Sequence, residues 1–286
     1  MNGLPLRSKP RSWKKAGPGA FSTDCVGNGG FCHVRYRHPL RPEAASLSGT
    51  RLLFFSDLHI RPQTSFSILP DFVKWKGMDK IQAHLVSACE EFQPDYLLFG
   101  GDLMAFVSSY PDVVRFFHSL KSKKEKLGVH GNWDRMRSWF PSREWEKGLE
   151  SASLKLLVNR EYRRDGFRFF GLDDYRRGNP LYVPAQRKPL FECVLSHNPD
   201  TVPLSMSDEE LSGVDLILCG HTHGGQLRIP GFGAILTSSE HWKKFEYGLY
   251  EHKSGRARMF VSAGIGMTFL WKRFFCPPEI VMIELV

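Results

Sequence analysis

Side chains that bind divalent metals recur in five short blocks of the sequence, most of them beside a glycine or a serine. Those side chains belong to Asp57, His59, Asp102, Asn132, His197, His221 and His223. Carboxylate, imidazole and amide-oxygen ligands suit Mn²⁺, Fe or Zn²⁺, whereas structural zinc sites are usually built from thiolates. Two such ions about 3.5–4 Å apart can share a carboxylate and activate water for in-line attack on phosphorus. The blocks therefore predict a two-metal site.

Each block follows a short apolar run that has the length and composition of a buried β-strand. The five runs cover 52–55, 96–99, 127–129, 193–195 and 216–219. Open α/β sheets gather their ligands at the carboxyl ends of their strands, so we expect the blocks to meet at one edge. Glycines such as Gly101 and Gly220 keep these turns tight and let the backbone approach the site closely.

The remaining pattern indicates how those strands are supported. Apolar residues at Met78, Ile81, Leu85 and Cys89 have the spacing of one helix face, which predicts a helix over 78–92. Other expected elements are helices over 110–120 and 142–151 and strands over 154–158, 167–171, 259–261 and 280–285. Helices alternate with strands early in the chain and strands cluster late, which indicates a layered α/β sandwich.

Composition bounds the domain organisation. The chain has 286 residues, 42% hydrophobic and 24% charged, which allows one large core and differs from a disordered chain. Residues 1–48 are basic and rich in Gly and Pro, without sustained periodicity. We expect them to be a largely disordered extension with one candidate strand over 31–36. The folded domain is expected over 49–286.

The formal net charge of +9 indicates an anionic partner: a phosphorylated substrate, an acidic lipid or nucleic acid. Much of the excess lies in runs such as 7–15 and 121–126, whose ordinary role is a solvated surface. Because no aromatic-interleaved basic platform accompanies them, nucleic acid ranks last among the partners. No protein partner is evident from the sequence.

Two features predict a cytoplasmic protein, with peripheral attachment to the anionic inner face of the cytoplasmic membrane as the alternative. No apolar run approaches the roughly 20 residues that cross a bilayer, and no signal-peptide core is present. Cys89, Cys193 and Cys219 lie in apolar stretches, where a reduced thiol acts as a small hydrophobe. A metal cluster at 25, 32 and 33 is not favoured, because no second Cys/His pair completes it.

The order Asp-x-His, Gly-Asp, Gly-Asn-x-Asp, His and Gly-His-x-His resembles the calcineurin-like metallophosphoesterase family over roughly 50–286. The resemblance implies an α/β (α+β) fold, a four-layer αββα sandwich with two mixed β-sheets flanked by helices. It also implies a hydrolase with two divalent ions, of which manganese is favoured and iron or zinc is the alternative. Asp57, His59 and His223 would hold the first ion, Asn132, His197 and His221 the second, and Asp102 would bridge them. Asp102, Asn132 and His197 would carry catalysis.

Other polar residues near the blocks receive supporting roles. Asp134 is expected to brace the Asn132 loop by hydrogen bonding rather than to bind metal. A satisfied core position is expected for the remaining histidines considered, which are His84, His118, His130, His241 and His252.

The block at Gly131 departs from the family pattern, which is usually Gly-Asn-His-Asp but here is Gly-Asn-Trp-Asp. The family histidine lies beside the scissile phosphate, and an indole has no basic nitrogen to replace it. The best-known enzymes that cleave UDP-2,3-diacylglucosamine in lipid A synthesis are similar in their metal blocks and also lack it. Trp133 is therefore expected either to bind substrate, by stacking on uracil or lining an acyl groove, or only to pack against the neighbouring helix.

The stretches 224–231, 262–266 and 273–279 resemble the bacterial phosphodiesterase branch that is often found near membranes. The expected substrate is a phosphorylated, lipid-linked nucleotide, with UDP-2,3-diacylglucosamine giving UMP and 2,3-diacylglucosamine 1-phosphate as the specific prediction. The alternatives are a general phosphodiesterase or phosphatase for soluble substrates and a non-catalytic metal-binding scaffold. Aromatic residues over 268–275 are expected in the core, or alternatively as a lipid-facing patch with Lys272 and Arg273 at the headgroups. In the second case, residues 138–141 could form the wall that faces the patch.

Overall fold

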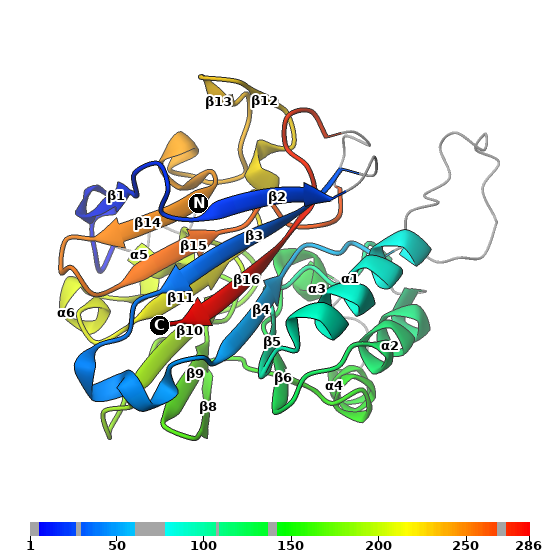
Figure 1. Ribbon diagram of the computed structural model, residues 1–286, viewed down its shortest axis with the longest axis horizontal. Coiled ribbons are helices and arrows are strands. Elements are labelled where there is room, and N and C mark those ends of the chain that lie inside the picture. The colour runs from blue at the N-terminus through cyan, green and yellow to red at the C-terminus, as the bar shows by residue number, and fades with distance from the viewer. Residues whose placement is uncertain (1–5, 27–29, 61–77, 107–108, 137–141, 268–272) are drawn as a thin grey trace.

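Two seven-stranded mixed sheets form the centre of the protein in the computed structural model (Figure 1), which describes residues 6–26, 30–60, 78–106, 109–136, 142–267 and 273–286. We name the sheets after β4 and β10. In order across the β4 sheet, the strands are β2 (Ser22–Val26), β3 (Phe31–His38), β16 (Glu279–Leu285), β4 (Arg51–Phe55), β5 (Tyr96–Phe99), β6 (Glu125–Gly128) and β7 (Leu154–Leu156). In order across the β10 sheet, they are β1 (Trp13–Lys15), β14 (Gly248–His252), β15 (Arg258–Val261), β11 (Leu216–Cys219), β10 (Phe191–Ser196), β9 (Phe167–Gly171) and β8 (Arg160–Arg164).

Shorter elements connect the strands. The α-helices are α1 (Met78–Phe92), α2 (Tyr110–Ser119), α3 (Asn132–Met136), α4 (Ser142–Ser151), α5 (Thr201–Ser205) and α6 (Asp208–Leu211). The 3-10 helices are η1 (Pro10–Ser12), η2 (Pro42–Leu47), η4 (His223–Gly225) and η5 (Trp242–Phe245). A small hairpin pairs β12 (Arg228–Ile229) with β13 (Gly233–Ala234).

Strand direction brings the polar blocks together. In the β4 sheet, β4, β5 and β6 run parallel, with Phe55 opposite Phe99 and Phe99 opposite Gly128. In the β10 sheet, β10 runs parallel to β11, with Ser196 opposite Cys219. The loops that follow these five strands therefore leave each sheet at its carboxyl-terminal edge.

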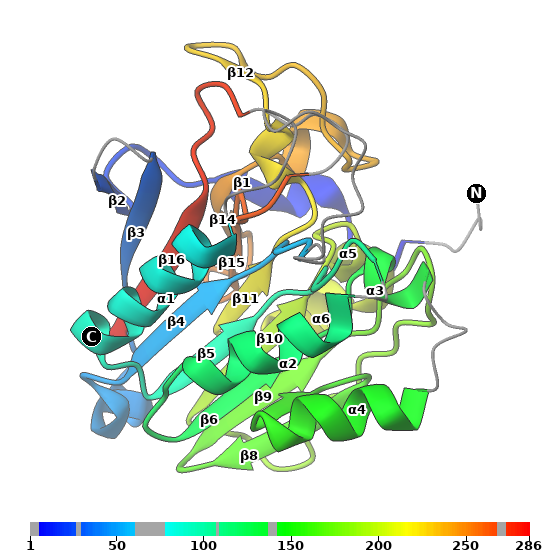
Figure 2. The same ribbon diagram turned by 90° about the vertical axis from the view of Figure 1, so that its right-hand side faces the viewer.

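Alternation along the strands explains the layers. Leu53 and Phe55 of β4 pack in the apolar cluster formed with α1 and α2, whereas Leu52 and Phe54 point into the core between the two sheets. Successive residues of a strand face opposite sides, so strands buried on both faces consist of uninterrupted apolar residues. Figure 2 shows α1, α2 and α4 over the outer face of the β4 sheet. The outer face of the β10 sheet packs apolar residues such as Ile217 against Val202 of α5 and Leu211 of α6. The predicted four-layer sandwich is confirmed.

The predicted elements agree with the structure where the apolar pattern is strong. The strands over 96–99, 167–171 and 216–219 and the helix over 78–92 have the predicted bounds. The strand β8 was missed, because its sequence Arg-Glu-Tyr-Arg-Arg has no apolar face and its residues are largely exposed. Pairing with β9 and an ion pair between Glu161 and Arg168 hold it on the edge of the β10 sheet.

The prediction of a largely disordered N-terminal extension is wrong for residues 6–26 and 30–48. The strand β3, which extends the candidate over 31–36, pairs along its length with β16 and also with β2. Alternate residues of β3, among them Val34 and Tyr36, are buried in the core between the sheets. Near the start of the chain, Trp13 is fully buried on β1. These scattered apolar side chains bury enough surface to order a segment whose average composition is polar.

The cysteines form a disulfide that the sequence did not indicate. Cys25 and Cys32 face each other across β2 and β3 and are bonded. Disulfides are more typical of an oxidising compartment than of the cytoplasm. The predicted reduced, buried state is confirmed for Cys89, Cys193 and Cys219. Within the described residues, the helices are all too short or too polar to cross a membrane.

Candidate metal centre

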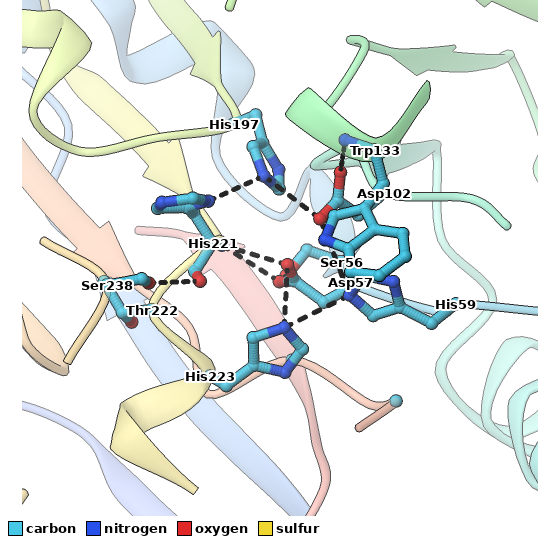
Figure 3. Close-up of polar contacts among 12 residues, drawn as sticks. Ser56, Asp57, His59, Asp102, Trp133, His197, His221, Thr222, His223 and Ser238 are labelled. Atoms are coloured by element: carbon cyan, nitrogen blue, oxygen red, sulfur yellow. Dashed lines mark hydrogen bonds and ion pairs between the residues drawn. The ribbon is translucent and has the colours of Figure 1, made fainter. Parts of the chain in front are cut away.

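The seven predicted ligands lie close together between the two sheets, on the loops that follow β4, β5, β6, β10 and β11. Figure 3 shows six of them pointing toward a common centre. Asn132, the seventh, opens α3 directly after the β6 loop, and its Oδ1 lies 3.1 Å from Nε2 of His197. Distant parts of the sequence thus meet at one point, as for His59 and His223, which are 164 positions apart and whose Nε2 atoms are separated by 3.2 Å.

The backbone at this point is held in an uncommon conformation. The φ angles of Asp57, His59, Asp102, His221 and His223 are 56°, 46°, 59°, 70° and 52°, in the left-handed region. Non-glycine residues rarely adopt it, and such residues cluster at functional sites where the surrounding structure enforces them. Here the left-handed turn at each strand end aims the side chain back toward the neighbouring loops.

Two overlapping groups of side chains have the geometry to hold metal ions. Asp57, His59 and His223 form one group, and Asp57, Asp102 and His197 form the other, with the ligand atoms of each group within 4.8 Å of one another. Asp57 therefore belongs to both groups. Oδ2 of Asp102 also lies between the two, 3.5 Å from Nε2 of His59 and 3.5 Å from Nε2 of His197.

The tautomer of His197 leaves an open lone pair in the centre. Its Nδ1 is 2.8 Å from the carbonyl oxygen of Gly100 and donates a hydrogen bond to it. In the neutral ring, Nε2 then faces Oδ1 of Asn132 and Nδ1 of His221, each at 3.1 Å, without a proton to share. A cation among these atoms would satisfy all three, so the donor set fits a metal ion.

Charge in the centre favours the same interpretation. Burial lowers the pKa of His197, but the facing Asp102 carboxylate outweighs it and raises that pKa to about 10, so a proton competes with a metal ion for Nε2. Burial acts to raise the pKa of Asp102, yet His197 and His59 hold it below its usual range. Burial raises the pKa of Asp57 to about 6 against the opposing charge of His197. Two buried carboxylates among imidazoles therefore form a site that attracts positive charge.

Comparison with known proteins agrees with this geometry. The family model described as calcineurin-like phosphoesterase matches residues 50–225, more than half of the chain. The chain belongs to that family.

Three relatives extend the similarity beyond the matched range. Phosphodiesterase YaeI of Escherichia coli is 30% identical over 259 residues, which cover 87% of each protein. The uncharacterized metallophosphoesterase YkuE of Bacillus subtilis is 28% identical over 280 residues, 90% of each. UDP-2,3-diacylglucosamine pyrophosphatase LpxG of Chlamydia muridarum is 33% identical over 298 aligned positions, 84% of each. These relatives support a hydrolase of phosphoric ester bonds.

Asp134 joins two loops of the phosphoesterase centre, as the sequence predicted. Its Oδ2 accepts hydrogen bonds from the backbone N–H of Asp102 at 2.9 Å and of Gly131 at 2.8 Å, and its Oδ1 accepts one from Leu103 at 2.9 Å. Burial raises the pKa of Asp134 to about 7, while these donors favour its ionised form. Gly131 is required at this junction, because a β-carbon there would lie 2.0 Å from Oδ1 of Asp102.

Trp133 lies in the centre of the phosphoesterase rather than away from it. Its indole meets the imidazole of His59 edge to face, with ring centroids 5.3 Å apart and an interplanar angle of 81° (Figure 3). Its backbone N–H donates to Oδ1 of Asp102 at 2.9 Å. The residue is partly exposed.

The five other histidines considered lie outside both ligand groups. His130 and His252 are buried, as expected, and His84 is half-buried against His33. The core prediction is wrong for His118, which is exposed on α2, and His241 is only half-buried.

Sequence reasoning missed two supporting residues. The Ser56 hydroxyl donates to Oδ2 of Asp57 at 2.6 Å. Of the two positions expected for Arg273, the core position is correct and the headgroup position is wrong. Its guanidinium points inward, 3.5 Å from Nδ1 of His223 and bonded to the carbonyls of Ala263 and Gly266. The possible wall over 138–141 and residues 268–272 lie outside the described residues.

Proposed function

We propose that the chain hydrolyses a phosphodiester or pyrophosphate bond and prefers a lipid-linked nucleotide pyrophosphate. The specific substrate proposed is UDP-2,3-diacylglucosamine, with UMP and 2,3-diacylglucosamine 1-phosphate as products. The observation that carries this choice is Trp133, which stands against His59 where the family pattern has a histidine.

Trp133 favours a substrate whose leaving group needs no acid. Indole nitrogen can donate a hydrogen bond but has no lone pair with which to carry a proton. A departing phosphate has a pKa of about 6 and leaves as an anion, whereas an alkoxide, with a pKa comparable to the roughly 15.7 of water, leaves well only when protonated. A pyrophosphate therefore suits this site better than an alkyl ester.

The name of one relative supports the same class. The Chlamydia muridarum protein is named UDP-2,3-diacylglucosamine pyrophosphatase and is 33% identical over most of both chains. Trp133, which is partly exposed, offers an aromatic ring on which a uracil could stack.

The proposed roles of the ligands follow from their contacts. Two divalent ions, with manganese favoured over iron or zinc, would supply Lewis-acid activation of water and of the phosphoryl group. Asp102 would hold both ions, because its carboxylate lies between His59 and His197. His197 is fixed by Gly100, and with Asn132 it would orient the phosphoryl group.

The second candidate is a general phosphodiesterase or phosphatase for soluble substrates, which the name of the Escherichia coli relative favours. The third, a non-catalytic scaffold, has less support because a scaffold gains little from seven converging ligands.

The deciding experiment offers manganese-loaded protein UDP-2,3-diacylglucosamine in mixed micelles and follows the release of UMP. Bis(p-nitrophenyl) phosphate serves as the general substrate, and the Asp102→Asn variant as the inactive control. Release of UMP by the wild type but not by the Asp102→Asn variant supports the proposal. Hydrolysis of the general substrate without UMP release would favour the second candidate, and inactivity on both would favour the scaffold.

We also propose that the protein works at a membrane as a peripheral protein, at its inner face if the protein is cytoplasmic, because the proposed substrate carries acyl chains. The net charge of +9 supports contact with anionic lipid.

A further inference from the structure

Large apolar side chains are exposed in a group beside the metal centre. They lie on the β12–β13 hairpin and just after it, on η5 and on the segment before β16, and we call them the apolar rim. The rim consists of Ile229, Phe232, Leu236, Trp242, Phe274 and Phe275, whose exposed fractions run from 46% to 72%. Exposed large apolar residues are ordinary singly, but a group of them marks an interaction surface.

Contacts between the three segments make the rim one surface. Leu227, at the base of the hairpin, forms a β-bridge with Phe274, and the N–H of Arg228 donates to the Phe274 carbonyl at 2.9 Å. The Phe274 and Phe275 rings meet edge to face with centroids 4.5 Å apart. From η5, Nζ of Lys243 reaches the hairpin, 3.0 Å from the Phe232 carbonyl and 3.1 Å from the centre of its ring.

The rim adjoins the metal centre directly. The 3-10 helix η4, which begins at the ligand His223, is separated from β12 by only two residues. On the other side of the rim, Arg273 contacts the His223 ring and is followed in the chain by Phe274. In both Figure 1 and Figure 2, the hairpin and the segment before β16 project beyond the sheets at the same end of the molecule.

We propose that the apolar rim inserts into the interfacial region of an anionic lipid bilayer. This insertion deepens the proposed function and rests on it, because a lipid-linked substrate would be present in the bilayer. Interfacial membrane anchors typically combine Phe and Trp with Lys: the rings enter the acyl boundary and the cations remain at the headgroups. Lys243, on the Phe232 ring, and the net charge of +9 complement an anionic surface.

The composition favours a bilayer over a second copy of the chain. A self-complementary interface would bring together two molecules that each carry a net charge of +9, at an electrostatic cost that an anionic membrane does not impose. Phe232 also lies on a protruding hairpin, between β12 and β13, which can enter the headgroup layer without rearranging the sheets (Figure 1).

Vesicle flotation with the full chain tests the proposal. The vesicles contain phosphatidylcholine alone or phosphatidylcholine with one quarter phosphatidylglycerol. We expect the wild type to float with the anionic vesicles and the double variant Phe232→Ser/Phe275→Ser to lose about tenfold or more of its partitioning. The matched control is Leu181→Ser, which changes another exposed apolar residue, 56% exposed and outside the rim. Unchanged melting temperatures would establish that the variants are folded.

Three results would overturn the proposal. They are failure of the wild type to float with anionic vesicles, equal flotation of the rim variant, and a wild-type dimer that the rim variant converts to a monomer in light scattering. The Asp102→Asn variant separates this proposal from the proposed function, because it should float like the wild type. If the protein floats through the rim but releases no UMP, the proposal of membrane insertion stands and the proposal of a lipid-linked substrate fails.

Discussion

The backbone N–H of Trp133 donates a hydrogen bond to Oδ1 of Asp102 at 2.9 Å, which turns the other carboxylate oxygen toward two imidazoles. That oxygen, Oδ2, is 3.5 Å from Nε2 of both His59 and His197. The residue that departs from the family pattern therefore positions the carboxylate proposed to bridge the metals. The hydrogen bond from residue 133 comes from its backbone and does not depend on its side chain. The side chain can therefore change while the position of the Asp102 carboxylate is kept.

Asp102→Asn should remove both metal ions. An amide at this position loses the charge and half of the acceptor capacity of a bridging carboxylate. Since even outer hydrogen-bond partners of ligands contribute 10–100-fold to affinity or activity, we expect a loss above about 100-fold in hydrolysis. Elemental analysis measures the bound metal, and Asp165→Asn, an exposed carboxylate paired with Lys124, is the control. Two retained ions and wild-type turnover would disprove the bridging role.

Asp134→Ala should loosen the two loops that it connects. The change leaves the N–H groups of Asp102, Leu103 and Gly131 without their acceptor. Unsatisfied buried donors cost about 1–3 kcal/mol each, so a lower melting temperature is expected together with 10–100-fold weaker metal binding. Thermal unfolding with and without manganese measures both effects. Wild-type metal affinity in this variant would mean that the loops are positioned by other contacts.

The metal centre could be predicted from the sequence because its ligands follow strands that are apolar on both faces. Leu52–Phe55 and Tyr96–Phe99, for example, are unbroken apolar runs whose carboxyl ends have to lie at one edge of a parallel sheet. Each run ends in a ligand block, so the local sequence pattern and the arrangement of the sheet both place the ligands at the same edge.

Other parts of the structure depend on contacts that local composition does not encode. Trp13 and Val34 stand alone among polar neighbours, and only distant strands, β14 and β16, make their burial possible. Arg273 lies in an exposed-looking aromatic run, yet the carbonyls of Ala263 and Gly266 draw its guanidinium inward. A cation that satisfies buried carbonyls cannot be distinguished by sequence from one at a lipid headgroup.

Trp13→Ala should destabilise the whole fold, although residue 13 lies in a segment of polar composition. The indole is fully buried, and its ring centroid lies 5.0 Å from that of His252. Removing a buried aromatic ring costs about 3–5 kcal/mol. Urea unfolding measures the change, with Leu6→Ala, 46% exposed, as the control in the same segment. Equal stability of the two variants would mean that residues 6–15 detach in solution.

Acid should destabilise the fold through His38. Burial first, and then the nearby Arg258, lower the pKa of this imidazole to about 3 against the opposing Asp215, from 6.5 in the unfolded chain. Below pH 6.5 the unfolded chain binds a proton that the folded chain excludes, so stability falls as pH falls toward about 3. One such group contributes a slope of about 1.4 kcal/mol per pH unit. His38→Gln should reduce the slope by that amount, whereas His118→Gln, on an exposed residue, should not. Parallel pH dependence of the wild type and His38→Gln would disprove the assignment.

Trp133→His should change which substrates the enzyme prefers. A histidine side chain would restore acid assistance to the leaving group, which typically contributes about 10²–10⁴-fold. Wild-type protein should cleave a nucleotide pyrophosphate far faster than a simple alkyl phosphodiester, and the variant should gain activity on the alkyl ester. If the indole stacks on uracil, the same variant should show a raised KM for the nucleotide. Steady-state kinetics on both substrates, with wild type and variant at equal metal content, measure these effects.

Trp133→Phe separates acid assistance from packing. Phenylalanine keeps an aromatic ring against His59 but can neither donate nor accept a proton, so it should preserve the wild-type preference for the pyrophosphate. The backbone N–H of residue 133 still reaches Oδ1 of Asp102 in both variants, so metal content should not change. A gain on alkyl esters in the Trp133→His variant, and not in Trp133→Phe, would assign the preference to the missing acid. Equal wild-type rates on both substrates, unaltered by either substitution, would show that Trp133 only packs and that the pyrophosphate argument fails.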